Sequence, residues 1–217
     1  MNCYQNLNLP TNLLKPGVVD EFNELKYGYH TRNNKSNINT NVEDFLSEEL
    51  LHTFKEQCNI TPKYFLLFPS YPGQKGFLHS DIYYENDHWN TVPCGINWDV
   101  GPTESIIQWH APIEPVEEIL PRYTPYDPDW HDRGLNNKVS AAKFYGERDS
   151  KDTSKFKIID SLILDGNPRL FRTDIPHQII HTNSNNISQR ICISIRFGLE
   201  DISTWERALE IFKPIMG

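Results

Sequence analysis

The sequence predicts a mostly β protein, a sandwich or jelly-roll barrel with helices packed on one face. Residues 63–198 contain many short apolar runs separated by Gly, Pro and Asn, which is the pattern of strands and turns. Apolar residues recur at helical spacing only before and after this region. No repeat of about 20–50 residues is visible, which argues against solenoids and propellers.

Length and composition favour one folded unit. The chain has 217 residues, of which 38% are hydrophobic, so residues 1–217 are expected to form a single domain. Its formal net charge of −8 argues against a nucleic acid as the main partner. No apolar run approaches the ~18–20 residues that span a bilayer, and the first residues lack the features of a signal peptide. We therefore expect a soluble, cytoplasmic protein without a membrane partner.

The N-terminal part, residues 1–62, is expected to be an extension followed by one helix. Its first forty residues are rich in Asn and contain Pro10 and Pro16, so they should wrap the outside of the domain, with a helical turn around 18–25. A helix is predicted over about 43–58, where acidic residues near the start suit the helix dipole. Its apolar stripe consists of Phe45, Leu46, Leu50, Leu51 and Phe54.

The β-barrel core is expected over residues 63–198. Its predicted strands are 63–69, 76–84, 94–100, 105–110, 156–164, 169–173, 177–182 and 190–197. Turn residues predict antiparallel hairpins around Gly101-Pro102 and through the last four strands. Residues 112–154 contain five prolines and many charges, and are expected to be an irregular insertion, either a lid or a solvated loop.

The last segment, residues 199–217, is expected to be a helix. It should begin at Ser203, because Glu206 three positions later completes a capping box. The four cysteines are widely scattered, which predicts ordinary thiols rather than a disulfide framework or a zinc site.

His79-Ser80-Asp81 is the first feature that carries chemistry. On an extended segment, positions i and i+2 point the same way, so this imidazole and this carboxylate would converge as two of three ligands of a metal ion. A motif this short also arises by chance, in which case the residues are an exposed polar pair. Context therefore decides between the two interpretations.

The context comes from two predicted strands about a hundred residues downstream. One carries His177 and His181, and the next carries Arg190 and Arg196. A carboxylate and two histidines on one face of a metal leave other positions open, as non-haem Fe(II) oxygenases need for a co-substrate and O₂. Arginine offers a permanently charged fork for a co-substrate carboxylate. Together these residues predict an iron and 2-oxoglutarate site.

Over roughly residues 64–198 the sequence resembles the Fe(II)/2-oxoglutarate-dependent oxygenase superfamily. The order His-x-Asp, then His, then Arg is that family's order. Similar local passages are Tyr71-Pro72-Gly73 ahead of the metal motif, Cys94-Gly95-Ile96-Asn97, and His177-x-Ile followed by Arg190.

The resemblance implies a double-stranded β-helix core, which is jelly-roll or cupin-like. It also implies a hydroxylase that uses Fe(II), 2-oxoglutarate and O₂, with ascorbate as an accessory reductant, and releases succinate and CO₂. The resemblance does not define the substrate; the acidic net charge and the aromatic residues are compatible with a peptide side chain, a free amino acid or a small metabolite.

Only one of the two downstream histidines can join His79 and Asp81, because residues four apart on a strand are about 13 Å apart. If a hairpin turns near Asn185, His177 faces about position 193 and Arg190 lies roughly 10 Å further along, which suits a five-carbon diacid. We therefore expect His177 as the ligand and Arg190 as the co-substrate anchor. His181 would lie beside the metal ligands or face the co-substrate.

The strand that begins at Arg190 should place Arg190, Cys192, Ser194 and Arg196 on one face. Such a face is either part of the site or an ordinary solvated surface. Arg196 is the second candidate for contact with the co-substrate. Asn97 is a third, unless it is a turn-side amide.

Two other functions fit the same residues. In a non-catalytic jelly-roll binding module, His79-Ser80-Asp81 would be incidental. The Arg190 to Arg196 spacing also resembles the R-x₅-R of the branch that repairs alkylated nucleobases, although the acidic net charge counts against it.

Overall fold

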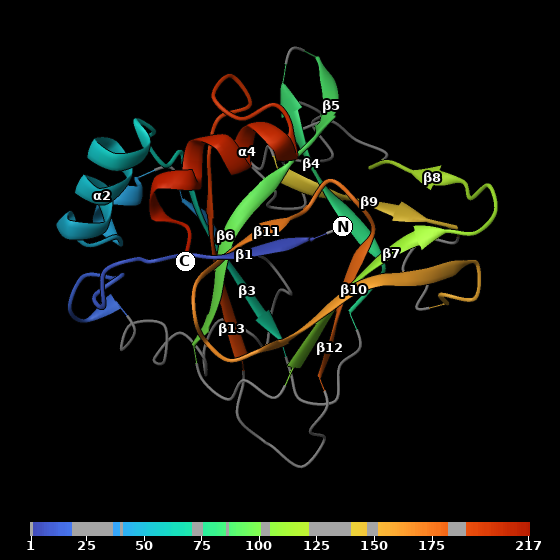
Figure 1. The fold of residues 1–217 in the computed structure, drawn as a ribbon. Helices are drawn as coiled ribbons and strands as arrows, with labels where there is room; N and C mark the ends of the chain where they lie inside the picture. Colours follow the sequence, from blue (N-terminus) through green and yellow to red (C-terminus); the bar gives the residue numbers. More distant parts are fainter. Residues whose placement is uncertain are drawn as a thin grey trace.

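Two antiparallel sheets face each other in the computed structural model of the chain (Figure 1). The structure describes residues 2–18, 37–39, 41–70, 76–85, 87–100, 105–121, 140–146, 152–181 and 190–217. Most of the predicted helical turn at 18–25, the turns at 71–73 and 101–102, and the tip at 183–186 lie outside these residues.

Within the described residues, one sheet has six strands and the other has seven. The six-stranded sheet runs in the order β1 (Tyr4–Asn6), β11 (Arg169–Arg172), β6 (Cys94–Val100), β13 (Arg190–Arg196), β3 (Tyr64–Ser70) and β2 (Asn37–Asn39). The seven-stranded sheet runs β10 (Phe156–Leu164), β7 (Ser105–Pro112), β12 (His177–His181), β4 (His79–Glu85), β9 (Ser140–Tyr145) and β8 (Glu118–Ile119), and β5 (His88–Thr91) pairs with β4.

Successive strands alternate between the sheets: β10, β11, β12 and β13 lie in the second, first, second and first sheet in turn. This winding is the double-stranded β-helix, so the predicted fold class is confirmed. The predicted hairpins are wrong, since β6 and β7 lie in different sheets, as do β12 and β13. The same turn residues and the same alternation of polar and apolar residues occur when two successive strands pair in one sheet and when the chain crosses from one sheet to the other. Only the packing of the two sheets distinguishes these two connections.

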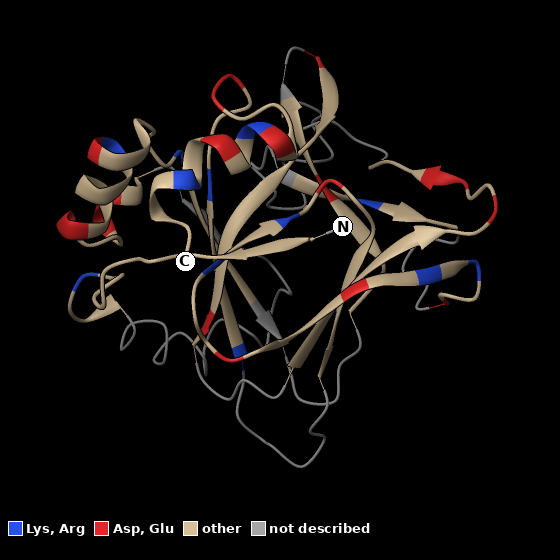
Figure 2. Cartoon of the chain, in the orientation of Figure 1, with Lys and Arg blue, Asp and Glu red and all other residues tan. Residues whose placement is uncertain are grey.

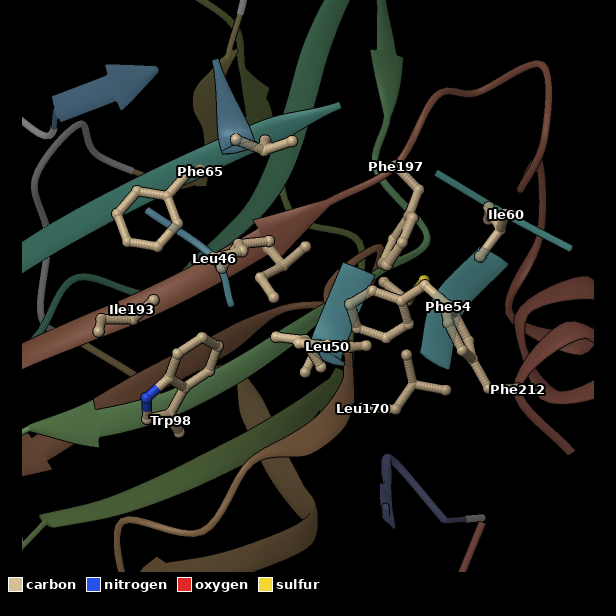
Figure 3. Close-up of a cluster of buried hydrophobic side chains, with 14 of the residues drawn as sticks. Leu46, Leu50, Phe54, Ile60, Phe65, Trp98, Leu170, Ile193, Phe197 and Phe212 are labelled. Carbon is tan, nitrogen blue, oxygen red and sulfur yellow. The ribbon is translucent and has the colours of Figure 1, made fainter. Parts of the chain in front are cut away.

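The two faces of β13 have opposite characters, as the alternation predicted. The main hydrophobic core on the outer side of the six-stranded sheet includes Ile191, Ile193 and Ile195. Figure 3 shows Ile193 in this cluster. Every residue of β13 is nevertheless buried, so the face that carries Arg190 and Arg196 lies between the sheets. The alternative of a solvated charged face is therefore wrong.

The helices cover the outer face of the six-stranded sheet. Figure 1 shows α2 (Glu48–Cys58) and α4 (Trp205–Phe212) on the same side of the molecule, and residues of both join the core with β3, β6 and β13. Two boundaries differ from prediction. The first helix is split into η1 (Val42–Asp44) and α2, because Ser47 accepts a hydrogen bond from the Leu50 amide and starts a new helix.

The C-terminal helix begins later than predicted. Thr204 is its N-cap and accepts from the Arg207 amide, so Ser203 lies outside the helix and Glu206 is in the first turn rather than in a capping box. The helix ends in a short 3-10 turn, η2 (Lys213–Ile215). Ser and Thr are both favoured N-cap residues, so residue type alone does not distinguish Ser203 from Thr204.

Two segments expected outside the barrel contribute to it. The insertion 112–154 supplies β9, which pairs with β4 so that Phe144 lies opposite His79 and Ala142 opposite Asp81. Near the N-terminus, β1 pairs with β11, and Cys3 is fully buried. Cys3 packs there in a second core cluster with Ile107, Trp109, Leu164 and Phe171.

Charged residues are dispersed over the described elements in the view of Figure 2. Figure 2 shows acidic and basic segments interspersed on the helices and strand ends, with no basic face in this view. Among the described residues, no helix is both long and apolar enough to cross a membrane.

All four cysteines are free and buried, which confirms ordinary thiols. Burial raises the pKa of Cys94 and Cys192 to about 12, and that of Cys3 and Cys58 to about 11. The thiolate is the reactive form, so we expect all four to resist iodoacetamide in the folded protein at about pH 8 and to react fully in denaturant. Mass spectrometry after a short exposure checks this, and labelling of a native thiol at the rate of free cysteine would contradict it.

Candidate metal centre

The predicted ligands come together inside the barrel on two neighbouring strands. β4 holds His79 and Asp81 two residues apart, and its side chains alternate, so both point between the sheets. β12 pairs with β4 so that His177 lies directly opposite His79. The two imidazole rings are 4.5 Å apart between centroids. The register of one strand pair therefore places two imidazoles and one carboxylate side by side.

One oxygen of Asp81 faces both histidines. Its Oδ1 is 3.5 Å from Nε2 of His79 and 4.0 Å from Nε2 of His177. One ligand atom from each of the three residues lies within 4.8 Å of the others. The arrangement can thus offer two nitrogen atoms and one oxygen atom to one ion.

The backbone fixes both imidazole rings. Nδ1 of His79 lies 2.8 Å from the Phe77 carbonyl oxygen, and Nδ1 of His177 lies 3.0 Å from that of Ile175. A carbonyl only accepts hydrogen bonds, so each Nδ1 carries the proton and each Nε2 presents a lone pair. This is the support that metal-binding histidines have in proteins.

Arg196 binds the other oxygen of Asp81. Its Nη2 donates to Oδ2 at 2.5 Å, and its Nη1 donates to Oγ1 of Thr173 at 3.1 Å. Thr173 also accepts the backbone N–H of Asp81 on its carbonyl at 2.9 Å. Arg196 and Thr173 therefore fix both the side chain and the backbone of the carboxylate.

The electrostatics favour the state of the site that binds a cation. Burial alone would favour a neutral carboxyl, but Arg196, His177 and His79 together hold the pKa of Asp81 below its ordinary value. Burial and the neighbouring His79 lower the pKa of His177 to about 4. At neutral pH the carboxylate is ionised and the His177 ring is neutral, which are the forms that ligate metals.

His181 lies apart from the cluster, at the other end of β12. Its Nδ1 is 2.7 Å from Oγ of Ser105. Burial and the nearby Arg190 charge lower the pKa of His181 to about 4. The structure thus brings His177, and not His181, to His79 and Asp81.

Arg190 forms a buried ion pair at this same end of the barrel. Its Nε donates to Oδ2 of Asp99 at 2.5 Å and its Nη2 donates to Oδ1, and the two side chains are only 5% and 2% exposed. Asn97 is buried on the neighbouring strand, where its Oδ1 accepts from Ser194 Oγ at 2.5 Å. Three of the four predicted co-substrate residues, Arg190, Arg196 and Asn97, therefore face the interior between the sheets.

Two residues that hydrogen-bond to the arginines were not identified from the sequence: Asp99, which binds Arg190, and Thr173, which binds Arg196. Asp99 could have been found, because it follows Asn97 by two residues on one strand and so shares its face. Thr173 gives no such signal, since its link to Arg196 and Asp81 depends on three segments that are distant in the sequence.

The fold and the site define a double-stranded β-helix protein with a His-Asp-His cluster between its sheets. Solved structures that resemble the chain include HygX from Streptomyces hygroscopicus with nickel and 2-oxoglutarate bound, at a TM-score of 0.39 and 10% identity over 89% of this chain and 83% of that one. The apo structure of HygX matches at a TM-score of 0.34 and 9% identity, over 85% and 80%. Comparison with protein families and with curated proteins finds no match.

Proposed function

We propose that the protein is an Fe(II)/2-oxoglutarate-dependent oxygenase that hydroxylates a peptide side chain or a small metabolite. One observation carries the proposal: Nε2 of His79, Oδ1 of Asp81 and Nε2 of His177 converge between the sheets of a double-stranded β-helix. Two histidines and one carboxylate that leave further positions open are typical of non-haem Fe(II) oxygenases.

The residues fit an iron ion by their chemistry. Both rings are held by their Nδ1 atoms with Nε2 toward Asp81, and Arg196 binds Oδ2 of Asp81, whereas Oδ1 is the oxygen that faces both Nε2 atoms. When bound, iron would supply the chemistry by which O₂ oxidises 2-oxoglutarate to succinate and CO₂ and hydroxylates a substrate C–H bond, one oxygen atom going to succinate and the other to the hydroxyl group.

Arg190 is the proposed anchor for the far carboxylate of 2-oxoglutarate. It lies near His181, which is four residues, or about 13 Å, along β12 from His177. A five-carbon diacid and an arginine side chain together span such a separation. Asp99 shares the Arg190 guanidinium, so in this proposal it holds the fork in place for the co-substrate.

Substrate would reach the site past His79. The His79 side chain is 28% exposed, whereas that of His177 is 7% exposed. The Phe144 ring lies 6.4 Å from the His79 ring, and Phe77 packs edge-on against Phe144. These two rings would contact an apolar part of the substrate and keep water from the reacting atoms.

Metal binding is the first test. We expect the purified protein to bind about one Mn(II) per chain, and saturation at about 100 times the Kd to raise the melting temperature by roughly 5–10 °C. Asp81→Ala is the matched variant and should show neither effect. A wild-type chain that binds no Mn(II) or Fe(II) would instead indicate a non-catalytic jelly-roll module.

Turnover is the second test. With Fe(II), ascorbate and 2-oxoglutarate, we expect succinate to form, and to form faster when a pool of peptides or small metabolites contains the substrate. Stimulation by an alkylated oligonucleotide alone would shift the assignment to nucleobase repair. Metal binding without any succinate formation would contradict the oxygenase proposal itself.

A further inference from the structure

Gly95 on β6 lies directly against the guanidinium of Arg196. A Cβ atom built on Gly95 would lie 2.4 Å from Nη1, 2.6 Å from Cζ and 2.8 Å from Nε of Arg196. Real Cβ atoms essentially never approach other heavy atoms this closely. Gly95 is not among the glycines with positive φ, so its backbone conformation does not itself require glycine. Glycine is therefore required at position 95 because the Arg196 side chain occupies the space that a Cβ atom would need.

The Arg196 side chain cannot shift away from Gly95 without losing hydrogen bonds. Its side chain is 8% exposed, and its two terminal nitrogens are held by Asp81 and Thr173. Gly198 provides a contrast on the same chain. A Cβ there would lie 2.3 Å from Oε1 of Glu200, but that side chain is 58% exposed and can turn into water. The same substitution is thus costly at one glycine and tolerable at the other.

We propose that Gly95 is a positioning residue for the metal ligand Asp81. Because Gly95 has no side chain, the Arg196 guanidinium can lie close against β6 and bind Oδ2 of Asp81. That contact leaves Oδ1 as the one oxygen directed at His79 and His177. The carboxylate is then a one-oxygen ligand, which keeps other metal positions open for the co-substrate. This inference rests on the proposed function, because it needs an ion at the triad.

The test is a double-mutant cycle on Mn(II) affinity, measured by titration calorimetry. We expect Gly95→Ala to weaken Mn(II) binding by about 10-fold or more, the effect typical of losing an outer partner of a metal ligand. In an Arg196→Ala background the same change should alter the affinity less than about 2-fold, because the clash is gone. Gly198→Ala is the matched control and should bind Mn(II) like the wild type.

The outcomes separate this inference from the proposed function. If the wild type binds no Mn(II), the oxygenase proposal fails first. If the wild type binds and Gly95→Ala binds equally well, the role of Gly95 is refuted while the metal site stands. Equal losses in both backgrounds would show that Gly95 acts through β6 packing and not through Arg196, which also refutes it. If Gly95→Ala does not fold, recovery of folding in the double variant supports the steric coupling, and failure of both contradicts it.

Discussion

Replacing His177 by alanine is expected to abolish binding of Mn(II) or Fe(II), whereas the same change at His181 leaves binding within about 3-fold of the wild type. The physical reason is position: His177 lies opposite His79 in the strand register and faces Asp81, while His181 is four residues away and bonded to Ser105. Loss of one of three protein ligands removes most of the affinity of such a site.

Electron paramagnetic resonance of Mn(II) titrated into each variant measures this difference directly. Circular dichroism melting of the metal-free variants is the control, because neither change should unfold the chain. Loss of binding in His181→Ala with binding retained in His177→Ala would reverse the assignment of the third ligand. Retained binding in both would show that neither histidine is essential to the site.

Breaking the buried Arg190–Asp99 pair should give the largest loss of stability. In Asp99→Ala the Arg190 charge stays buried without its bidentate partner, and removing one member of a buried ion pair costs about 3–5 kcal/mol. For a chain of this length, that lowers the melting temperature by roughly 6–20 °C. Thermal or urea denaturation of the metal-free protein measures it.

Two further variants test whether the loss of stability comes from the unpaired buried charge. Glu200→Ala removes an exposed pair with Lys63 and should change the unfolding free energy by no more than about 1 kcal/mol. Arg190→Met with Asp99→Leu replaces both charges by apolar groups and should recover much of the stability. The double variant should nevertheless form no succinate from 2-oxoglutarate, because the proposed anchor for the co-substrate carboxylate is gone. A stable Asp99→Ala protein would mean that water or another group already solvates Arg190.

The sequence predicts the parts of the site whose residues are close together in the chain better than the parts whose residues are far apart. His79 and Asp81 converge because they are two apart on a strand, and local pattern alone was enough to predict that. The structure places His177 beside His79 and Asp81, although β12 and β13 do not form the hairpin from which this position was predicted. His177 reaches the cluster through its pairing with β4, a register that no local pattern specifies.

The sequence by itself determined eight of the thirteen described strands, the polar and apolar faces of β13, the positions of the two described α-helices to within a few residues, and the motif that places an imidazole beside a carboxylate. Those features follow from short-range periodicity and from local backbone preferences. The tertiary structure alone decided which sheet each strand joins, that Arg196 holds Asp81, that Arg190 pairs with Asp99, and that Gly95 makes room for a guanidinium. These contacts join strands far apart in the chain, and they are selected by packing two sheets face to face.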